Sequence, residues 1–170
     1  MRKKIFAFLL LSALYAGAQE VPDWENPIVV GINKEPYHAT LTLPSQKADC
    51  KEIISLNGKW RFQWSADPGK RPADFYKNDF NTDTWDTIIV PGAWQLQGYG
   101  KPIYSNVNYP FQKDAPRVTS EPPAEYYSYG HRNPTGSYVT TFEVTPDMKD
   151  KCLYLHFEGV KSAMYVWVNG

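Results

Sequence analysis

The chain has 170 residues, of which 18 are basic and 18 acidic, so its formal net charge is zero. This balance argues against nucleic acid and anionic membrane surfaces as partners. Aromatic residues make up 15% of the chain, and 14 prolines and 11 glycines interrupt it. Such a composition predicts an all-β domain with long loops.

The first 18 residues have the layout of a secretory signal peptide. Basic residues 2–4 precede an apolar run over residues 5–15, and the small residues 16–18 follow. We predict cleavage after Ala18 and a periplasmic or secreted location. The alternative is a membrane anchor, but the apolar run is well short of the roughly 20 residues that a spanning helix needs. No membrane association is therefore expected after cleavage.

Two regions are expected after the signal peptide. Residues 19–49 are largely polar and proline-broken, which predicts an extended leader wrapped over other parts of the protein. Residues 50–170 are the predicted folded domain. Near its start, Trp60, Phe62 and Trp64 occupy alternate positions, which predicts a half-buried strand with these side chains in the core.

The next predicted elements are short. Residues 72–80 are expected to form a helix, and residues 88–90 a strand that Pro91 ends. From Pro91 to Pro134 there is almost no periodicity. A stretch of this kind is usually functional or disordered, and its many aromatic residues argue against disorder. We therefore expect a functional loop.

Regular alternation returns in three later segments. Residues 137–144, 152–157 and 163–168 are predicted strands, and Trp167 in the last of them is expected in the core. The last strand runs into Asn169-Gly170, which is a strong hairpin signal without a returning strand. We therefore interpret the domain as truncated at its C-terminal end.

Cysteines and histidines give no clear site. Cys50 and Cys152 are the only cysteines, and export would permit a disulfide, but the sequence does not show whether they pair. No close pair of Cys or His has the spacing of a structural zinc site. The histidines have no partner at ligand or triad spacing and are interpreted as structural; they are His38, His131 and His156.

Six strings in one order carry a resemblance to a known family. They are Asp-Trp-Glu-Asn-Pro at 23–27, Leu-Asn-Gly-Lys-Trp-Arg-Phe at 56–62, Val-Pro-Gly-Ala-Trp-Gln at 90–95, Pro-Ile-Tyr-Ser-Asn-Val at 102–107, Asn-Pro-Thr-Gly at 133–136 and Phe-Glu-Gly-Val-Lys-Ser-Ala at 157–163. Together they resemble the N-terminal sugar-binding domain of glycoside hydrolase family 2 β-galactosidases of the large bacterial type. Some strings also recur in β-glucuronidases and β-mannosidases, whereas the first and fourth look particular to the galactosidase branch.

The resemblance implies a jelly-roll β-sandwich of the galactose-binding type. In the intact enzyme, immunoglobulin-like domains and a TIM barrel would follow, and both are absent from this chain. The implied reaction is retaining hydrolysis of terminal non-reducing β-D-galactose residues, with both catalytic glutamates downstream. The implied partners are a galactoside or oligosaccharide substrate and further copies of the same enzyme in a homo-oligomer.

No catalytic residue is expected within the 170 residues. Glu25, Glu143 and Glu158 match no catalytic position and are interpreted as surface or turn carboxylates. The isolated chain is therefore expected to be inactive. It is also expected to be poorly soluble, because its last strand would present an unpaired edge.

Asn106 is the main substrate-binding candidate that the resemblance implies. A carboxamide offers both donors and acceptors to neutral sugar hydroxyls, and a site built to bond a hydroxyl penalises sugars that lack it. The alternative is that Asn106 caps a turn. Tyr104 and Trp94 are weaker candidates as platforms for sugar stacking, with packing inside the loop as the alternative.

A peripheral magnesium site is also implied. Asp23, Asn26 and the carbonyl of Val29 match family positions that help to bind this ion, and hard oxygen ligands suit it. The intact family enzyme also implies sodium. Against the site, one further ligand would lie beyond Gly170, and the region near Lys149 lacks the expected glutamine.

Two other hypotheses stay open. The domain could act alone as a non-catalytic carbohydrate-binding module, which the reading frame after codon 170 would decide. The enzyme could instead act on β-glucuronides or β-mannosides, which a panel of nitrophenyl glycosides would decide. Export and an extra polar and aromatic insert at 121–131 separate the chain from the best-known branch, and the insert puts its fine substrate preference in question.

Overall fold

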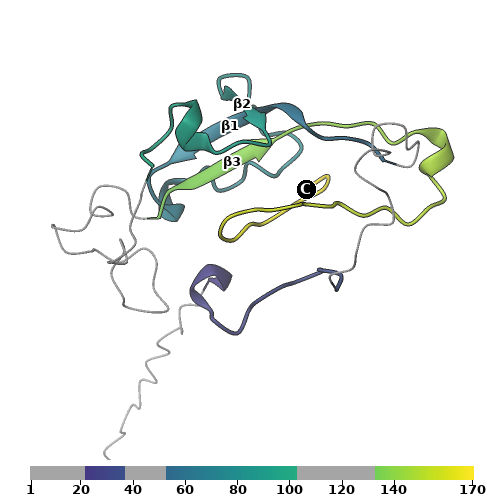
Figure 1. Cartoon of the computed structure of the whole chain (residues 1–170), viewed down its shortest axis with the longest axis horizontal. Helices are drawn as coiled ribbons and strands as arrows, with labels where there is room; N and C mark the ends of the chain where they lie inside the picture. Colours follow the sequence, from purple (N-terminus) through teal and green to yellow (C-terminus); the bar gives the residue numbers. More distant parts are fainter. Residues whose placement is uncertain (1–21, 37–52, 103–132) are drawn as a thin grey trace, which may run out of the picture.

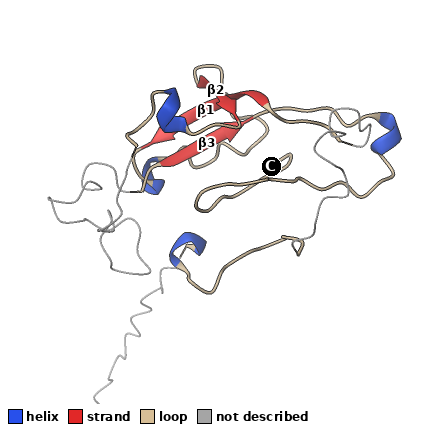
Figure 2. Ribbon diagram, viewed as in Figure 1, coloured by secondary structure: helices blue, strands red, loops and turns tan. Residues whose placement is uncertain are grey.

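The computed structural model describes residues 22–36, 53–102 and 133–170, and these contain one antiparallel sheet (Figure 1). Its strands are β1 (Gly58–Ser65), β2 (Asp86–Val90) and β3 (Thr135–Val139), in the order β2-β1-β3. The helical segments of the described residues are short 3-10 turns, namely η1 (Asp23–Glu25), η3 (Pro68–Lys70), η4 (Trp94–Gln97) and η6 (Pro146–Met148) (Figure 2). The described ranges hold no α-helix, in agreement with the predicted all-β class.

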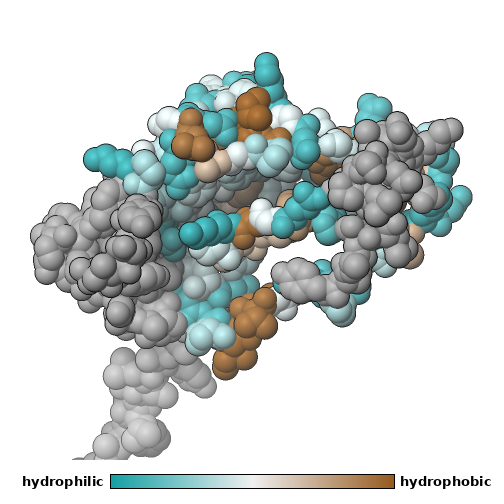
Figure 3. All heavy atoms as spheres, viewed as in Figure 1, coloured by the Kyte–Doolittle hydropathy of each residue, from teal (hydrophilic) through white to brown (hydrophobic). Residues whose placement is uncertain are grey.

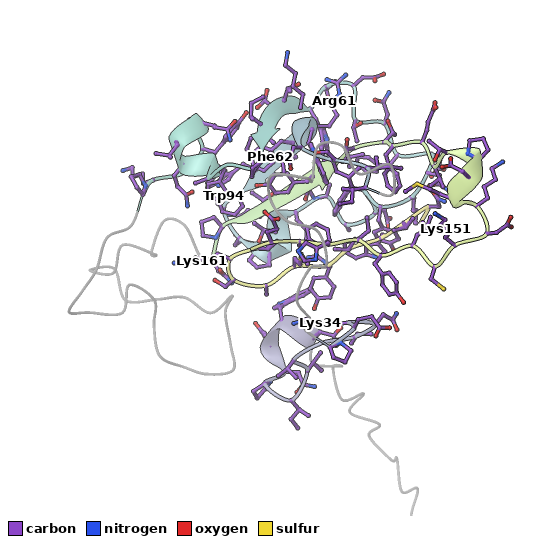
Figure 4. All side chains as sticks on the ribbon, turned by 45° about the vertical axis from the view of Figure 1, so that its right-hand side comes forward. Lys34, Arg61, Phe62, Trp94, Lys151 and Lys161 are labelled. Carbon is purple, nitrogen blue, oxygen red and sulfur yellow. The ribbon has the colours of Figure 1, made fainter. Side chains whose placement is uncertain are left out.

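The middle strand β1 has one aromatic and one polar face, as its alternating sequence predicts. Phe62 is fully buried, and Trp60 and Trp64 on the same face are partly buried. Lys59 and Arg61 point the other way and are exposed. Figure 4 shows Phe62 and Arg61 on opposite sides of the sheet. The first predicted strand is therefore confirmed.

The register of the strands determines which residues of β2 and β3 lie on the aromatic face of β1. Phe62 lies opposite Tyr138 on β3 and Asp86 on β2, while Trp60 lies opposite Ile88. Ile88 is 1% exposed, and hence this face contributes the innermost apolar side chains of the sheet. The predicted strand at 88–90 is confirmed as the second half of β2.

The C-terminal segment differs from the sequence prediction. β3 runs from Thr135 to Val139, so the strand predicted at 137–144 is confirmed only over its first three residues and is wrong over residues 140–144. No strand is assigned over residues 152–157 or 163–168, so these two predicted strands are wrong. The segment instead runs as an extended loop that doubles back beside the sheet (Figure 1). Alternation alone does not make a strand, because the backbone also needs a partner, and in the described residues none pairs with this segment. Trp167 is 41% exposed, and thus its predicted core position is also wrong.

The predicted helix at 72–80 is replaced by consecutive turns. The Lys77 amide donates to the Asp74 carbonyl (3.0 Å) and the Phe80 amide to the Lys77 carbonyl (3.1 Å), which closes single turns only. The side-chain amide of Asn78 donates to the carbonyl of Asn169 (3.1 Å). The turns therefore contact the C-terminal segment. A segment of nine residues without a strong apolar period has little intrinsic tendency to form a helix, so such contacts can determine its conformation.

Aromatic stacking ties the C-terminal segment to these turns and to the leader. The Trp167 ring stacks on Tyr76 with a centroid distance of 5.0 Å, and Tyr165 meets Trp24 edge-on at 6.0 Å. The Arg71 guanidinium lies 4.8 Å from the centroid of the Trp24 ring, within the range of a cation–π contact. Trp24 thus joins the leader turn to two other segments of the chain.

Residues 27, 28 and 30–36 of the leader are exposed, whereas Glu25, Asn26 and Val29 are partly buried. Ile28 and Val30 are 86% and 89% exposed, and apolar side chains are visible on the lower part of the molecule in Figure 3. Among the described residues, no helix has both the length and the apolar character needed to cross a membrane.

Candidate functional site

Four aromatic side chains tie the segment 91–102 to the sheet, and we call them the aromatic frame: Phe62, Trp94, Tyr99 and Tyr138. Phe62 is the centre of the frame, with ring centroids 4.7 Å from both Tyr99 and Tyr138 and 6.2 Å from Trp94. Trp94 begins η4, and Tyr99 follows it directly after Gly98. The frame therefore fixes η4 against β1 and β3 by edge-on and tilted ring contacts, which are favourable for aromatic pairs.

Trp94 is partly buried and packs on the sheet. A Cβ atom at Gly136 on β3 would lie 2.6 Å from the Trp94 ring and 2.8 Å from the rings of Phe62 and Tyr138. Glycine is therefore required at this position for the rings to approach the strand. These contacts belong to a packing residue, and the role of Trp94 as a stacking platform for sugar stays a prediction.

Gln97 joins η4 to the outer edge of β2. Its side-chain carbonyl accepts from the Ile89 amide (2.8 Å), and its side-chain amide donates to the Ile89 carbonyl (3.0 Å). The carboxamide thus satisfies both backbone groups of one residue, as a neighbouring strand would do. This contact closes part of an edge that would otherwise be open to strand pairing.

Tyr99 adds a second tie to β2, because its hydroxyl donates to the Asp86 carboxylate (3.0 Å). Burial, followed by this hydrogen bond and the negative charge of Asp86, raises the pKa of the Tyr99 phenol above its ordinary value. Gly98 has a φ of 96°, and the Tyr99 amide bonds back to the Trp94 carbonyl (3.1 Å). A left-handed glycine therefore ends η4 and directs Tyr99 onto the frame.

The segment that ends at Pro102 and the segment that begins at Asn133 lie near the same end of the sheet. A Cβ atom at Gly100 would lie 3.4 Å from Nε1 of Trp64, near the end of β1. Trp64 lies opposite Gly136, close to the start of β3. The chain before Pro102 and the chain after Asn133 thus meet at this end. Tyr104 and Asn106 themselves lie outside the described residues.

The predicted magnesium ligands all lie on the leader turn. Asp23 is in η1, and the Asn26 amide bonds back to the Asp23 carbonyl (3.1 Å). The Asn26 side-chain oxygen accepts from the Ile28 amide (3.1 Å), and its backbone carbonyl accepts from the Val29 amide (3.1 Å). Asn26 is thus already used in the turn. No group of three or more His, Cys, Asp or Glu side chains able to hold a metal occurs in the described residues, so the turn offers only part of a ligand set.

Other singled-out residues lie apart from the frame. Glu143, Glu158 and His156 are exposed, and Glu25 lies in η1 with partial exposure. Cys152 is an exposed free thiol. Cys50, His38 and His131 lie outside the described residues, as does the insert at 121–131.

Comparison with known families identifies the domain. The family described as "Glycosyl hydrolases family 2, sugar binding domain" matches residues 53–170. The chain belongs to this family. The family 2 sugar-binding domain is a β-sandwich, so the predicted fold class is confirmed, and the sheet β2-β1-β3 is the part of that sandwich present in the described strands.

Similar proteins share most of this chain. It is 39% identical over 165 residues to a β-galactosidase of Priestia megaterium, a match that covers 91% of this chain and 15% of that protein. It is 41% identical over 155 residues to a β-galactosidase of Clostridium acetobutylicum, covering 87% of this chain and 17% of that protein. The large subunit of a Lactobacillus acidophilus β-galactosidase is 41% identical over 122 residues, which are 68% of this chain and 19% of the subunit. This chain therefore spans less than a fifth of the length of each of these relatives.

Sequence reasoning missed two residues that hold the frame in place. Gly136 directly precedes the strand predicted at 137–144. A glycine in or beside a strand often marks a place where another group approaches the backbone closely. That signal was present in the string Asn-Pro-Thr-Gly at 133–136. Gln97 gave no such signal, because a carboxamide in an aperiodic segment does not reveal which backbone it will pair with.

Proposed function

We propose that this domain is the sugar-binding part of an exported β-galactosidase that hydrolyses terminal non-reducing β-D-galactose residues. One observation carries the proposal: the chain matches the family 2 sugar-binding domain and is 39% to 41% identical to three proteins named as β-galactosidases or their large subunit. The reaction would be retaining, with two glutamates about 5 Å apart that lie outside this chain.

In this proposal Asn106 supplies hydrogen bonds to hydroxyls of the galactosyl ring. The geometry that supports it is the anchoring of the chain just before Pro102. Tyr99 packs on Phe62 at 4.7 Å, and Gly100 approaches the Trp64 ring. A loop that leaves a fixed base loses less conformational entropy when it binds a ligand, so its side chains select more sharply between sugars.

Two further features belong to the proposal. The first is export, which rests on the predicted signal peptide at 1–18 and places hydrolysis in the periplasm or outside the cell. The second is a magnesium ion at the leader turn, where the oxygens of Asp23, Asn26 and Val29 would supply part of its coordination.

The substrate assignment is tested on the full-length protein that carries this chain. Release of nitrophenol from β-galactoside, β-glucuronide and β-mannoside substrates should favour the galactoside. Preference for the glucuronide or the mannoside would reject the assignment. The isolated 170-residue chain should release no product from any of them, and measurable turnover by that chain would place catalytic groups inside it.

The role of Asn106 is tested by a matched pair of substitutions in the same full-length protein. Asn106→Ala should lower kcat/KM for the galactoside by about tenfold to a hundredfold, since each lost hydrogen bond to a sugar hydroxyl removes about 1 to 3 kcal/mol. Asn108→Ala removes the same group two residues further along. Equal losses in the two variants would argue for a general disturbance of the loop instead of a substrate contact.

A further inference from the structure

The polar face of the sheet carries a hollow of about 380 Å³ that the proposed function does not use. Arg61 lies on this face, on the side of the sheet away from Phe62 (Figure 4). The polar lining side chains are two cations and four hydroxyls, namely Lys59, Arg61, Thr82, Thr87, Thr140 and Thr141. The size lies within the range of roughly 300 to 1,000 Å³ that is usual for small-molecule sites.

The strand register explains how these groups meet. Arg61 in the middle strand lies opposite Thr87 on β2 and Val139 on β3, so all three share the polar face. Lys59 is two residues earlier and points the same way, at a separation of about 7 Å along the strand. Thr82 comes from the turn before β2, and hydroxyls thus border the two cations from neighbouring segments.

The two cations face a hollow that has no acidic lining residue. Both are exposed, and within the described residues neither forms an ion pair. Arg61 gives one donor to the Trp85 carbonyl at 3.4 Å, which leaves most of its five N–H donors for another acceptor. Like charges on neighbouring positions of one face repel each other, and a bound anion would remove that repulsion.

We propose that this hollow binds a saccharide that carries an oxyanion, either a carboxylate or a sulfate. The planar fork of Arg61 fits two oxygens of such a group, and the Lys59 ammonium adds a second charge-assisted bond. The threonine hydroxyls both donate and accept, which suits the neutral hydroxyls of the same sugar. The inference goes beyond the proposed function, because it concerns the opposite face of the sheet from the aromatic frame and does not depend on which glycoside is hydrolysed.

Calorimetric titration of the full-length protein tests the proposal with four probes. D-galacturonic acid and galactose 6-sulfate distinguish a carboxylate from a sulfate, while galactose and inorganic sulfate present the neutral sugar and the bare anion. Galactose also enters the active site of the proposed enzyme, so binding at the hollow is taken as the part of each signal that the Lys59 and Arg61 substitutions described below remove. At the hollow, at least one acidic sugar should bind more tightly than both controls, and its affinity should fall as salt is added. Equal binding of galactose at the hollow, or of inorganic sulfate as an adventitious ion only, would overturn the proposal.

Variants assign the binding to the hollow. The double substitution Lys59→Gln and Arg61→Gln should weaken binding of the acidic sugar by at least about tenfold, which corresponds to about 1.4 kcal/mol. Lys70→Gln with Lys77→Gln removes equal charge from lysines that pair with nearby aspartates elsewhere, and should leave the affinity unchanged.

A single Lys59→Gln variant tests whether a folding defect explains the loss, because the Lys59 side chain is exposed and no hydrogen bond or ion pair of that side chain occurs in the described residues. It should weaken binding while the melting temperature stays at the wild-type value. Unchanged affinity in both the single and the double variant would reject the hollow as the site. The experiment measures binding and not turnover. A negative result for the hollow is therefore distinguishable from a failure of the proposed hydrolase activity.

Discussion

Adding one methyl group at Gly136 should disturb the aromatic frame more than any other change of that size. A Cβ atom there would lie 2.6 Å from the Trp94 ring and 2.8 Å from those of Phe62 and Tyr138, whereas favourable carbon contacts lie at about 3.5 to 4.0 Å. Three rings would have to shift together, and Phe62 among them is fully buried. Gly136 does not have a positive φ, so alanine suits the backbone and the cost is one of space.

Overpacking of this kind costs about 1 to 3 kcal/mol. For a domain of this size, 2 kcal/mol corresponds to a decrease in Tm of roughly 4 to 8 °C. Thermal and urea unfolding of the full-length protein, followed by tryptophan fluorescence, would measure the loss for Gly136→Ala in the unfolding transition of this domain. Because the frame anchors the chain before Pro102, we also expect KM for the galactoside to rise.

The matched control is Gly159→Ala, since a Cβ atom at Gly159 would meet nothing within 4 Å. It should leave the Tm within about 1 °C of the wild type or raise it slightly, because alanine restricts the unfolded chain. If the Gly136→Ala and Gly159→Ala variants had the same Tm, the close contacts of the three rings with Gly136 would be wrong.

Three further changes test separate contacts. Gln97→Glu should cost about 1 to 3 kcal/mol, because it replaces the donor to the Ile89 carbonyl (3.0 Å) with a carboxylate oxygen. Tyr99→Phe should cost about 1 kcal/mol through the lost bond to Asp86. Since the folded pKa of Tyr99 is raised, its contribution is complete below the unfolded pKa of about 10 and is lost as pH rises through the folded pKa, so the variant should show a smaller alkaline loss of stability. Under the proposed magnesium site, magnesium is expected to raise the Tm of the full-length protein, and Asp23→Asn should weaken that rise.

Each of these has a control in the same protein. Leu96→Ala changes a side chain that is 86% exposed beside Gln97, and should not affect unfolding. Tyr154→Phe removes a phenol that is 69% exposed and should leave the alkaline profile unchanged. Glu35→Gln removes an exposed leader carboxylate away from the turn. A variant that behaved like its control would contradict the contact assigned to it.

The sequence predicted the sheet best where alternation coincides with a partner strand. In β1 the period of two placed Phe62 inside and Arg61 outside, and the structure agrees because β2 and β3 pair along both edges of that strand. Residues 163–168 alternate in the same way, yet Trp167 is 41% exposed and no strand is assigned. Periodicity therefore specifies which face a residue takes, whereas pairing depends on distant backbone that a local pattern does not contain.

The candidate site shows the same division. Trp94 was singled out from its family context, but its contact with Gly136 joins residues 42 positions apart in the chain. The bond of Gln97 to Ile89 is closer in sequence, yet a carboxamide can pair with almost any free backbone group, so its partner follows only from the folded path. The family strings identified the segment, and the three-dimensional contacts identified what holds it.

The most direct test of the proposed function is the crystal structure of the full-length protein with galactose bound. The Asn106 carboxamide should lie within about 3 Å of a ring hydroxyl, the distance of a hydrogen bond, with η4 still packed on Phe62. A structure in which galactose is bound and that carboxamide is buried elsewhere, away from the sugar, would contradict the role given to this domain.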